Sequence, residues 1–191
     1  MSADSFIPYG RQTITDSDID SVVNILRSDY LTQGPTVPAF EHAVAQSVGA
    51  QHAVAVNSAT SALHIACLAL GLGPGDRLWT SPTTFVASAN CARYCGAEVD
   101  FVDIDPLTGL MSLHALESKL KHDELHNLLP KVVIPVHLCG TSCDMSSISL
   151  LSSRYGFTII EDASHAIGGT YQGQPVGCCI HSAITVFSFH P

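Results

Sequence analysis

The stretch that decides the fold is FTIIEDASH, residues 157–165, in which a short apolar run ends in two adjacent carboxylates. An apolar run of this length, bounded by turn residues, is typical of a strand buried on both faces of a parallel sheet. Ligands of open α/β sheets bind beyond the carboxyl ends of the strands. Asp162, which follows the strand predicted over residues 157–161, therefore lies where a ligand-binding carboxylate is expected.

Apolar strands alternate with amphipathic helices on both sides of this stretch. We expect strands over residues 52–56, 77–80, 98–103, 131–136 and 183–187, and helices ending near residue 70 and spanning residues 84–95, 112–121 and 145–155. Such alternation predicts an α/β fold in which helices flank a mostly parallel sheet. The glycines at 168, 169 and 173 precede no helical pattern and are interpreted as turn residues.

Two further helices are expected within residues 1–50. Thr15 and Asp18 have the spacing of a capping box, and apolar residues follow at helical spacing. A second amphipathic helix ends at Gly49. We expect this N-terminal segment and the sheet region, residues 51–191, to form one domain.

The composition excludes several classes of protein. With 17 acidic and 8 basic residues the net charge is -9, which disfavours sequence-independent binding of nucleic acid. No apolar stretch approaches the roughly 20 residues of a membrane span, and the first residues lack the pattern of a secretory signal, so a cytoplasmic location is expected. The seven cysteines lack the spacing of a structural zinc site. We expect free thiols and no metal centre.

Polar residues gather just beyond the predicted strands, at residues 57–61, 81–85, 137, 162–165 and 188–190. Residues 57–61 join a strand to a helix, where backbone N–H groups can hold a phosphate or form an ordinary N-cap. Asp162 suits either a protonated ring nitrogen or a helix cap, and Phe85 suits either stacking on a flat cofactor or the core. His137, His165, Ser188 and His190 carry the same ambiguity between ligand binding and structure.

Nine blocks carry a resemblance: residues 31–35 (LTQGP), 40–41, 57–64 (NSATSALH), 71–76 (GLGPGD), 84–88 (TFVAS), 101–105, 135–138, 161–165 (EDASH) and 187–190 (FSFH). In order and spacing they resemble the DegT/DnrJ/EryC1/StrS family of sugar aminotransferases, which are fold-type I enzymes dependent on pyridoxal 5'-phosphate (PLP). The resemblance implies the large domain of these enzymes, without the smaller C-terminal domain.

The resemblance also implies roles for individual residues. Cofactor contacts are expected from Ser58, Ala59, Thr60 and Ser188 near the phosphate, Phe85 on the ring, Asp162 at the pyridine nitrogen and His165 on the phenolate side; substrate contacts are expected from Tyr9, Thr32 and His190. Residues 28–35 and 161–165 most resemble the pseudaminic-acid branch. That branch transfers an amino group from glutamate to C4 of a UDP-linked 4-keto-6-deoxy sugar, with pyridoxamine 5'-phosphate (PMP) in the second half-reaction, and relatives are homodimers.

The Schiff-base lysine of the relatives is expected two positions beyond Pro191. Lys119, Lys121 and Lys131 all fall outside the motifs, so we expect the 191-residue chain itself to lack transaminase activity. Two alternatives remain open: a dehydratase of the same family, in which histidine replaces that lysine, and a non-catalytic remnant that only folds or binds ligand. A nicotinamide-dependent enzyme is disfavoured because the sequence has no glycine fingerprint.

Overall fold

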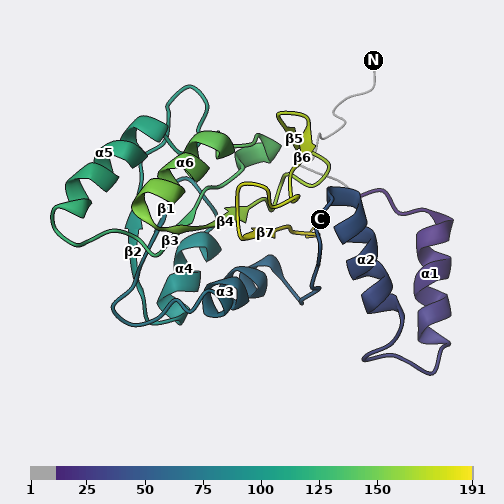
Figure 1. The fold of residues 1–191 in the computed structure, drawn as a ribbon. Helices are drawn as coiled ribbons and strands as arrows, with labels where there is room; N and C mark the ends of the chain where they lie inside the picture. The colour runs from purple at the N-terminus through teal and green to yellow at the C-terminus, as the bar shows by residue number, and fades with distance from the viewer. Residues whose placement is uncertain (1–11, 191) are drawn as a thin grey trace, which may run out of the picture.

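The computed structural model describes residues 12–190, and its centre is a five-stranded parallel sheet (Figure 1). The strand order is β2-β1-β3-β4-β7, with neighbouring strands all parallel. The strands are β1 (Arg77–Thr80), β2 (Glu98–Phe101), β3 (Val132–Ile134), β4 (Thr158–Asp162) and β7 (Ile184–Val186). The predicted α/β fold with a mostly parallel sheet is confirmed.

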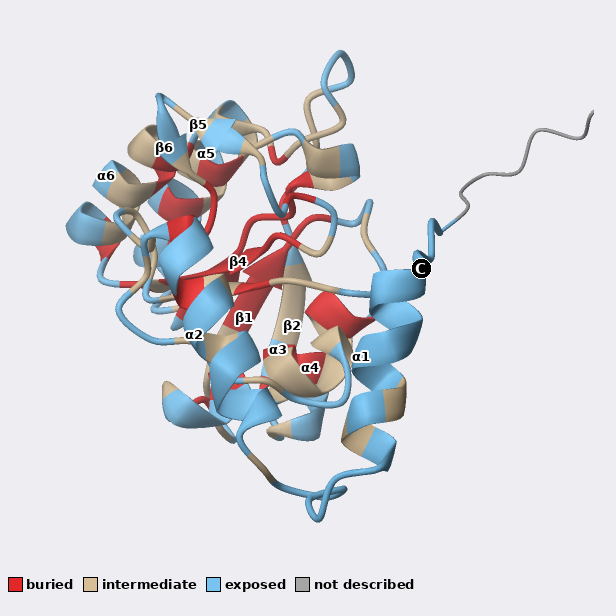
Figure 2. Cartoon of the chain, turned by 90° about the vertical axis from the view of Figure 1, so that its right-hand side faces the viewer, coloured by how far each residue is buried: buried red, intermediate tan, exposed pale blue. Residues whose placement is uncertain are grey.

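Helices cover both faces of the sheet. One face packs against α3 (Ala59–Ala69) and α4 (Ala87–Tyr94), and the other against α5 (Leu113–Glu124) and α6 (Met145–Tyr155). Successive strand residues point to opposite faces, so Leu78 joins the α3/α4 core and Trp79 joins the α5/α6 core. Figure 2 shows the buried positions concentrated in the strands and the inner sides of these helices.

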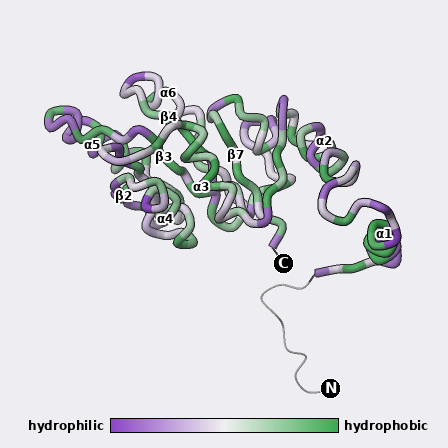
Figure 3. The backbone as a smooth tube through the Cα atoms, turned by 90° about the horizontal axis from the view of Figure 1, so that it is seen from below, coloured by the Kyte–Doolittle hydropathy of each residue, from purple (hydrophilic) through white to green (hydrophobic). Residues whose placement is uncertain are grey.

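The N-terminal helices α1 (Asp16–Leu26) and α2 (Thr36–Val48) lie beside the sheet region rather than on it (Figures 1 and 3). The predicted capping box of α1 is present, since Thr15 accepts from the Asp18 N–H and the Asp18 carboxylate accepts from the Thr15 N–H. Helix α2 ends at Gly49 with a left-handed φ of 72°, as predicted. No residue of α1 is buried, and Ile19, Val22 and Leu26 are exposed.

The strand predicted over residues 52–56 is wrong. This segment is extended but belongs to no ladder, and Val54 is 79% exposed. Its Ala55 N–H donates to Glu41 Oε1 of α2 at 2.8 Å. A strand is defined by pairing with a neighbour, and none of the strands in the described part of the chain lies beside this segment. The β-branched residues that suggested a strand report local preference only.

Two short elements connect the main ones: a 3₁₀ turn, η1 (Leu138–Gly140), and a hairpin of β5 (Thr170–Tyr171) and β6 (Gln174–Pro175). The hairpin turn has positive φ at both Gln172 (50°) and Gly173 (79°), as a type I′ turn requires. The interpretation of Gly173 as a turn residue is confirmed. Within residues 12–190, no helix combines the length and apolar character needed to cross a membrane.

Candidate functional site

Strand β4 ends with two carboxylates that point to opposite faces of the sheet. Asp162 shares a face with Ile160 and the α3/α4 core, whereas Glu161 shares a face with Ile159 and the α5/α6 core. Both carboxylates are buried, with only 4% of Asp162 and 5% of Glu161 exposed. The acidic pair of the sequence is therefore two separate sites, one on each side of β4.

The Asp162 carboxylate is held by three donors. Its Oδ2 accepts from the Ser88 hydroxyl at 2.5 Å, and its Oδ1 accepts from the Ser164 hydroxyl at 2.6 Å and the Ser164 N–H at 3.2 Å. A carboxylate oxygen can accept two hydrogen bonds. Oδ1 is therefore saturated, and Oδ2 retains capacity for one further donor, such as a protonated ring nitrogen.

Ser88 is a residue that the sequence prediction missed. Its side chain is fully buried in the first turn of α4, 74 positions before Asp162 in the chain. Its hydroxyl also lies 2.8 Å from the Thr84 hydroxyl. Ser88 belongs to the quoted TFVAS block, but a serine in a small-residue helix gives no sign of its partner. Only the packing of α4 beside β4 reveals the pair.

The N-terminus of α3 provides a second part of the site. Ser58 is the N-cap, and its side chain accepts from the Ser61 N–H at 3.2 Å. The N–H groups of Ala59 and Thr60 have no acceptor among the described residues. Free N–H groups in the first turn of a helix favour an anion such as phosphate. Helix α3 covers the same sheet face as Asp162, so these free N–H groups and the carboxylate share one side of the sheet.

Phe85 lies beyond β1 and just before α4, and 73% of its surface is exposed. The core interpretation left open from the sequence is therefore wrong. The residue is three positions from Ser88, which contacts Asp162 directly. An exposed aromatic ring near the start of the helix that contacts Asp162 is suited to covering the face of a flat ligand.

The segment after β7 carries Ser188 and His190. Ser188 is half-buried and its hydroxyl accepts from the His190 N–H at 3.2 Å, while His190 is exposed. Between them, the Phe189 ring packs edge-on against Phe40 of α2, with ring centroids 5.1 Å apart. This contact fixes the segment beside α2, at the carboxyl edge of the sheet where the sequence places it.

His165 is exposed three residues after Asp162. Its backbone carbonyl lies 2.9 Å from the position that a Cβ atom would take at Gly140, where φ is +86°. A side chain at Gly140 would displace this loop, so the glycine permits the close approach of η1 to the end of β4.

One predicted substrate residue is not brought to this site. Thr32 is exposed in the loop that joins α1 to α2, and this loop lies away from the sheet region (Figure 1). Tyr9 lies outside the described residues.

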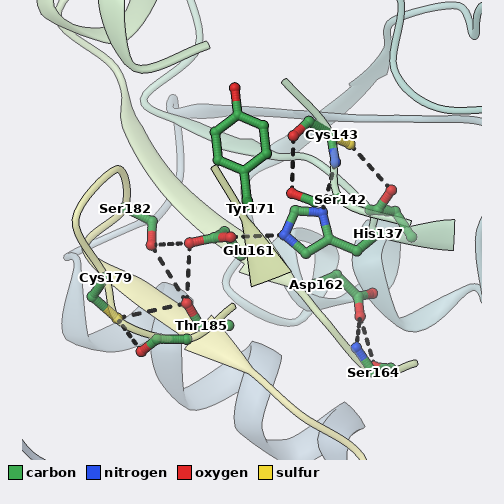
Figure 4. A network of polar contacts seen from close by, with 12 residues as sticks. His137, Ser142, Cys143, Glu161, Asp162, Ser164, Tyr171, Cys179, Ser182 and Thr185 are labelled. Carbon is green, nitrogen blue, oxygen red and sulfur yellow. Dashed lines mark hydrogen bonds and ion pairs between the residues drawn. The ribbon is translucent and has the colours of Figure 1, made fainter. Parts of the chain in front are cut away.

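Glu161 and His137 form a separate polar network (Figure 4). The His137 Nδ1 accepts from the Cys143 N–H at 3.2 Å, so its Nε2 carries the proton and donates to Glu161 Oε2 at 2.7 Å. Ser182 and Thr185 donate to Glu161 Oε1. Burial alone would raise the pKa of the Glu161 carboxyl, but these donors outweigh it and hold the pKa below its usual range. The network joins the ends of β3, β4 and β7, which gives His137 a structural role.

The comparisons with known proteins agree with this arrangement. A model of the DegT/DnrJ/EryC1/StrS aminotransferase family matches residues 12–191, and the chain belongs to this family. A protein of Streptococcus pneumoniae described as a sugar aminotransferase has been solved with PLP and with PMP. Its PLP form is 32% identical, with a TM-score of 0.85 over 96% of this chain and 49% of that protein.

Two further solved structures are similar to the chain. PseC of Helicobacter pylori, an aminotransferase of pseudaminic acid biosynthesis, is 32% identical, with a TM-score of 0.87 over 96% of this chain and 47% of PseC. A DegT/DnrJ/EryC1/StrS aminotransferase of Brucella abortus is 33% identical, with a TM-score of 0.81 over 91% of this chain and 45% of that protein. The chain thus spans about half the length of these relatives. The expectation of PLP and PMP agrees with the forms in which the family has been solved.

Proposed function

We propose that this chain is the cofactor-binding half of a PLP-dependent sugar aminotransferase, with PMP in the second half-reaction. The observation that carries the proposal is the Asp162 carboxylate, which is buried, oriented by three donors and left with one unused acceptor position on Oδ2. It shares a sheet face with the free N–H groups of Ala59 and Thr60 at the α3 N-terminus. One carboxylate and one anion site suit the two charged ends of this cofactor.

Each cofactor residue has a physical task. The α3 N-terminus holds the phosphate through backbone N–H groups, the Thr60 hydroxyl and the helix dipole, with Ser58 fixing the first turn and Ser188 donating from the segment after β7. Phe85 covers the ring face, and His165 lies on the phenolate side.

Asp162 holds a proton on the ring nitrogen, because an ionised carboxylate favours a protonated partner. When bound, the cofactor supplies an electron sink for the carbon that loses a proton in amino-group transfer. Burial of Asp162 strengthens its interaction with the ring nitrogen, since water competes little at a 4% exposed side chain.

The three lysines of the sequence are engaged elsewhere. Lys119 pairs with Asp100 and Asp123, Lys121 pairs with Glu117, and Lys131 pairs with Asp76. None of them contacts Asp162 or the α3 N-terminus. We therefore propose that this chain holds the cofactor without a covalent bond and that proton transfer requires a lysine outside these 191 residues.

For the substrates, we propose glutamate as amino donor and a UDP-linked 4-keto-6-deoxy sugar aminated at C4, as in pseudaminic acid biosynthesis. Support comes from the resemblance of residues 28–35 and 161–165 to that branch and from the similarity to PseC. His190, exposed next to Ser188, and Tyr9 are proposed substrate contacts.

We further propose a homodimer. Three apolar side chains of α1 are exposed, with Ile19 at 52%, Val22 at 58% and Leu26 at 65%. A second copy would bury them. Because Thr32 lies in the loop after α1, away from the chain's own sheet, its proposed substrate contact is with the site of the second copy.

The test is binding of PMP, which needs no lysine, measured by titration calorimetry on the 191-residue chain. The proposal predicts saturable binding that Asp162→Ala weakens roughly 10- to 150-fold, since a hydrogen bond to a charged group is worth about 1.5–3 kcal/mol. Asp144→Asn, on the opposite face of the sheet, serves as the control and should bind like the wild type. Absence of binding, or equal affinity of Asp162→Ala, would overturn the proposal.

A further inference from the structure

The hydroxyl groups of Thr84 and Ser88 form a directed chain that ends on Asp162. Ser88 Oγ lies 2.5 Å from Asp162 Oδ2, 2.8 Å from Thr84 Oγ1 and 3.4 Å from the Phe85 carbonyl. A hydroxyl has one hydrogen, and an ionised carboxylate can only accept. The Ser88 hydrogen therefore goes to Asp162, the shortest of the three contacts, and Thr84 must donate to Ser88.

The order of donors matters because the hydrogen bond from Thr84 to Ser88 strengthens the one from Ser88 to Asp162. A hydroxyl that accepts a hydrogen bond becomes a better donor, and chains of this kind are strengthened inside a protein. Ser88 is fully buried and Asp162 nearly so, which keeps water from replacing either bond. The chain starts at Thr84, directly next to the exposed Phe85, and ends at the carboxylate. It thus links the segment that carries the aromatic ring to the Asp162 carboxylate.

The hydroxyls of Ser88 and Ser164 together fix the orientation of the Asp162 carboxylate. Ser164 saturates Oδ1 from the loop after β4, while Ser88 occupies one side of Oδ2 from α4. Held from both sides, the carboxylate cannot rotate, and the one remaining acceptor position on Oδ2 has a fixed direction. A serine in the first turn of a helix usually bonds within its own helix. Ser88 instead makes its shortest bond across to β4.

We propose that Ser88, supported by Thr84, is a positioning residue that aims Asp162 Oδ2 at the ring nitrogen of the cofactor. The inference rests on the proposed function, because it assigns the unused acceptor of Oδ2 to that nitrogen. It adds Thr84, to which the proposed function gives no role, and it gives Ser88 the specific task of directing Oδ2.

The experiment uses the 191-residue chain and PMP labelled with ¹⁵N in the ring, whose NMR signal reports whether the nitrogen carries a proton. In Ser88→Ala the ring signal shifts toward the unprotonated form and PMP binds about tenfold more weakly. Thr84→Val, which keeps the shape but removes the hydroxyl, shifts both measurements in the same direction by less, and Thr84→Ser restores them. Ser153→Ala removes an exposed helical hydroxyl on α6 that bonds only to its own helix and serves as the control.

Each outcome decides between the two proposals. If the wild-type chain does not bind PMP, the proposed function fails and the inference fails with it. If the wild type binds and Ser88→Ala shows the same affinity and ring signal, only the positioning role is overturned. A loss of thermal stability in Ser88→Ala without a change in the ring signal also overturns it, because a structural serine would behave in that way. If Ser88→Ala does not fold, Thr84→Val decides by the same two measurements.

Discussion

Replacement of Glu161 by alanine should destabilise the fold severely. The change removes the acceptor of His137 Nε2–H, a group on a side chain with no exposed surface. Ser182 and Thr185, which are only half-buried, can turn to water. The main costs are therefore the orphaned N–H, about 1–3 kcal/mol for a buried donor without a partner, and the space that the side chain leaves empty. Urea unfolding of the wild type and the variant, followed by circular dichroism, measures this difference.

Glu161→Gln is the matched variant. Its amide oxygen can accept from His137 while its NH₂ donates to the hydroxyls of Ser182 and Thr185, which can rotate to accept, so about half the loss is expected. The pH dependence gives a second check. The folded pKa of Glu161 is lowered, so its contribution is complete above the unfolded value of about 4.3 and disappears as pH falls through the folded value. If Glu161→Ala costs less than about 1 kcal/mol, the buried network does not hold the three strand ends together.

Three further outcomes are expected. Donors from Tyr171 and Ser147 outweigh burial and lower the pKa of Asp144 to about 2, so Asp144→Asn should flatten the stability loss between about pH 4 and pH 2 in acid titration; an unchanged slope contradicts this. Gly177→Ala should lower the free energy of unfolding in urea by about 1–3 kcal/mol, because the φ of Gly177 is +100° and an added Cβ would lie 2.6 Å from the Phe187 ring. Gly156→Ala is the control and should cost less, because an added Cβ there meets no atom within 4 Å. Val22→Asp should weaken self-association in analytical ultracentrifugation, and an unaffected dimer would exclude α1 from the interface.

The sequence was most informative where the residues of a single helix or strand determine its structure. The apolar run before Asp162 predicted a buried strand and the edge at which the carboxylate lies, and Thr15 predicted the capping box of α1. Prediction failed where structure depends on a distant partner. Residues 52–56 have strand composition but no paired neighbour, and Ser88 meets Asp162 across 74 positions of sequence. No local pattern encodes such contacts.

The adjacent acids of β4 illustrate both cases. Strand periodicity alone requires Glu161 and Asp162 to face opposite ways. Which of the two carboxylates keeps a free acceptor position follows only from the tertiary structure. His137 and Ser182 hydrogen-bond to the two carboxylate oxygens of Glu161. The donors of Asp162 leave one acceptor position on Oδ2 open. His137 was ambiguous from the sequence because its partner was unknown, and its buried hydrogen bond to Glu161 favours a structural role.

The most direct test of the central claim is a crystal structure of the chain with bound PMP. We expect the phosphate to accept from the N–H groups of Ala59 and Thr60, and the ring nitrogen to lie about 3 Å from Asp162 Oδ2 with Phe85 over the ring. An ordered cofactor whose ring nitrogen points away from Asp162, or whose phosphate lies elsewhere than the α3 N-terminus, would contradict it.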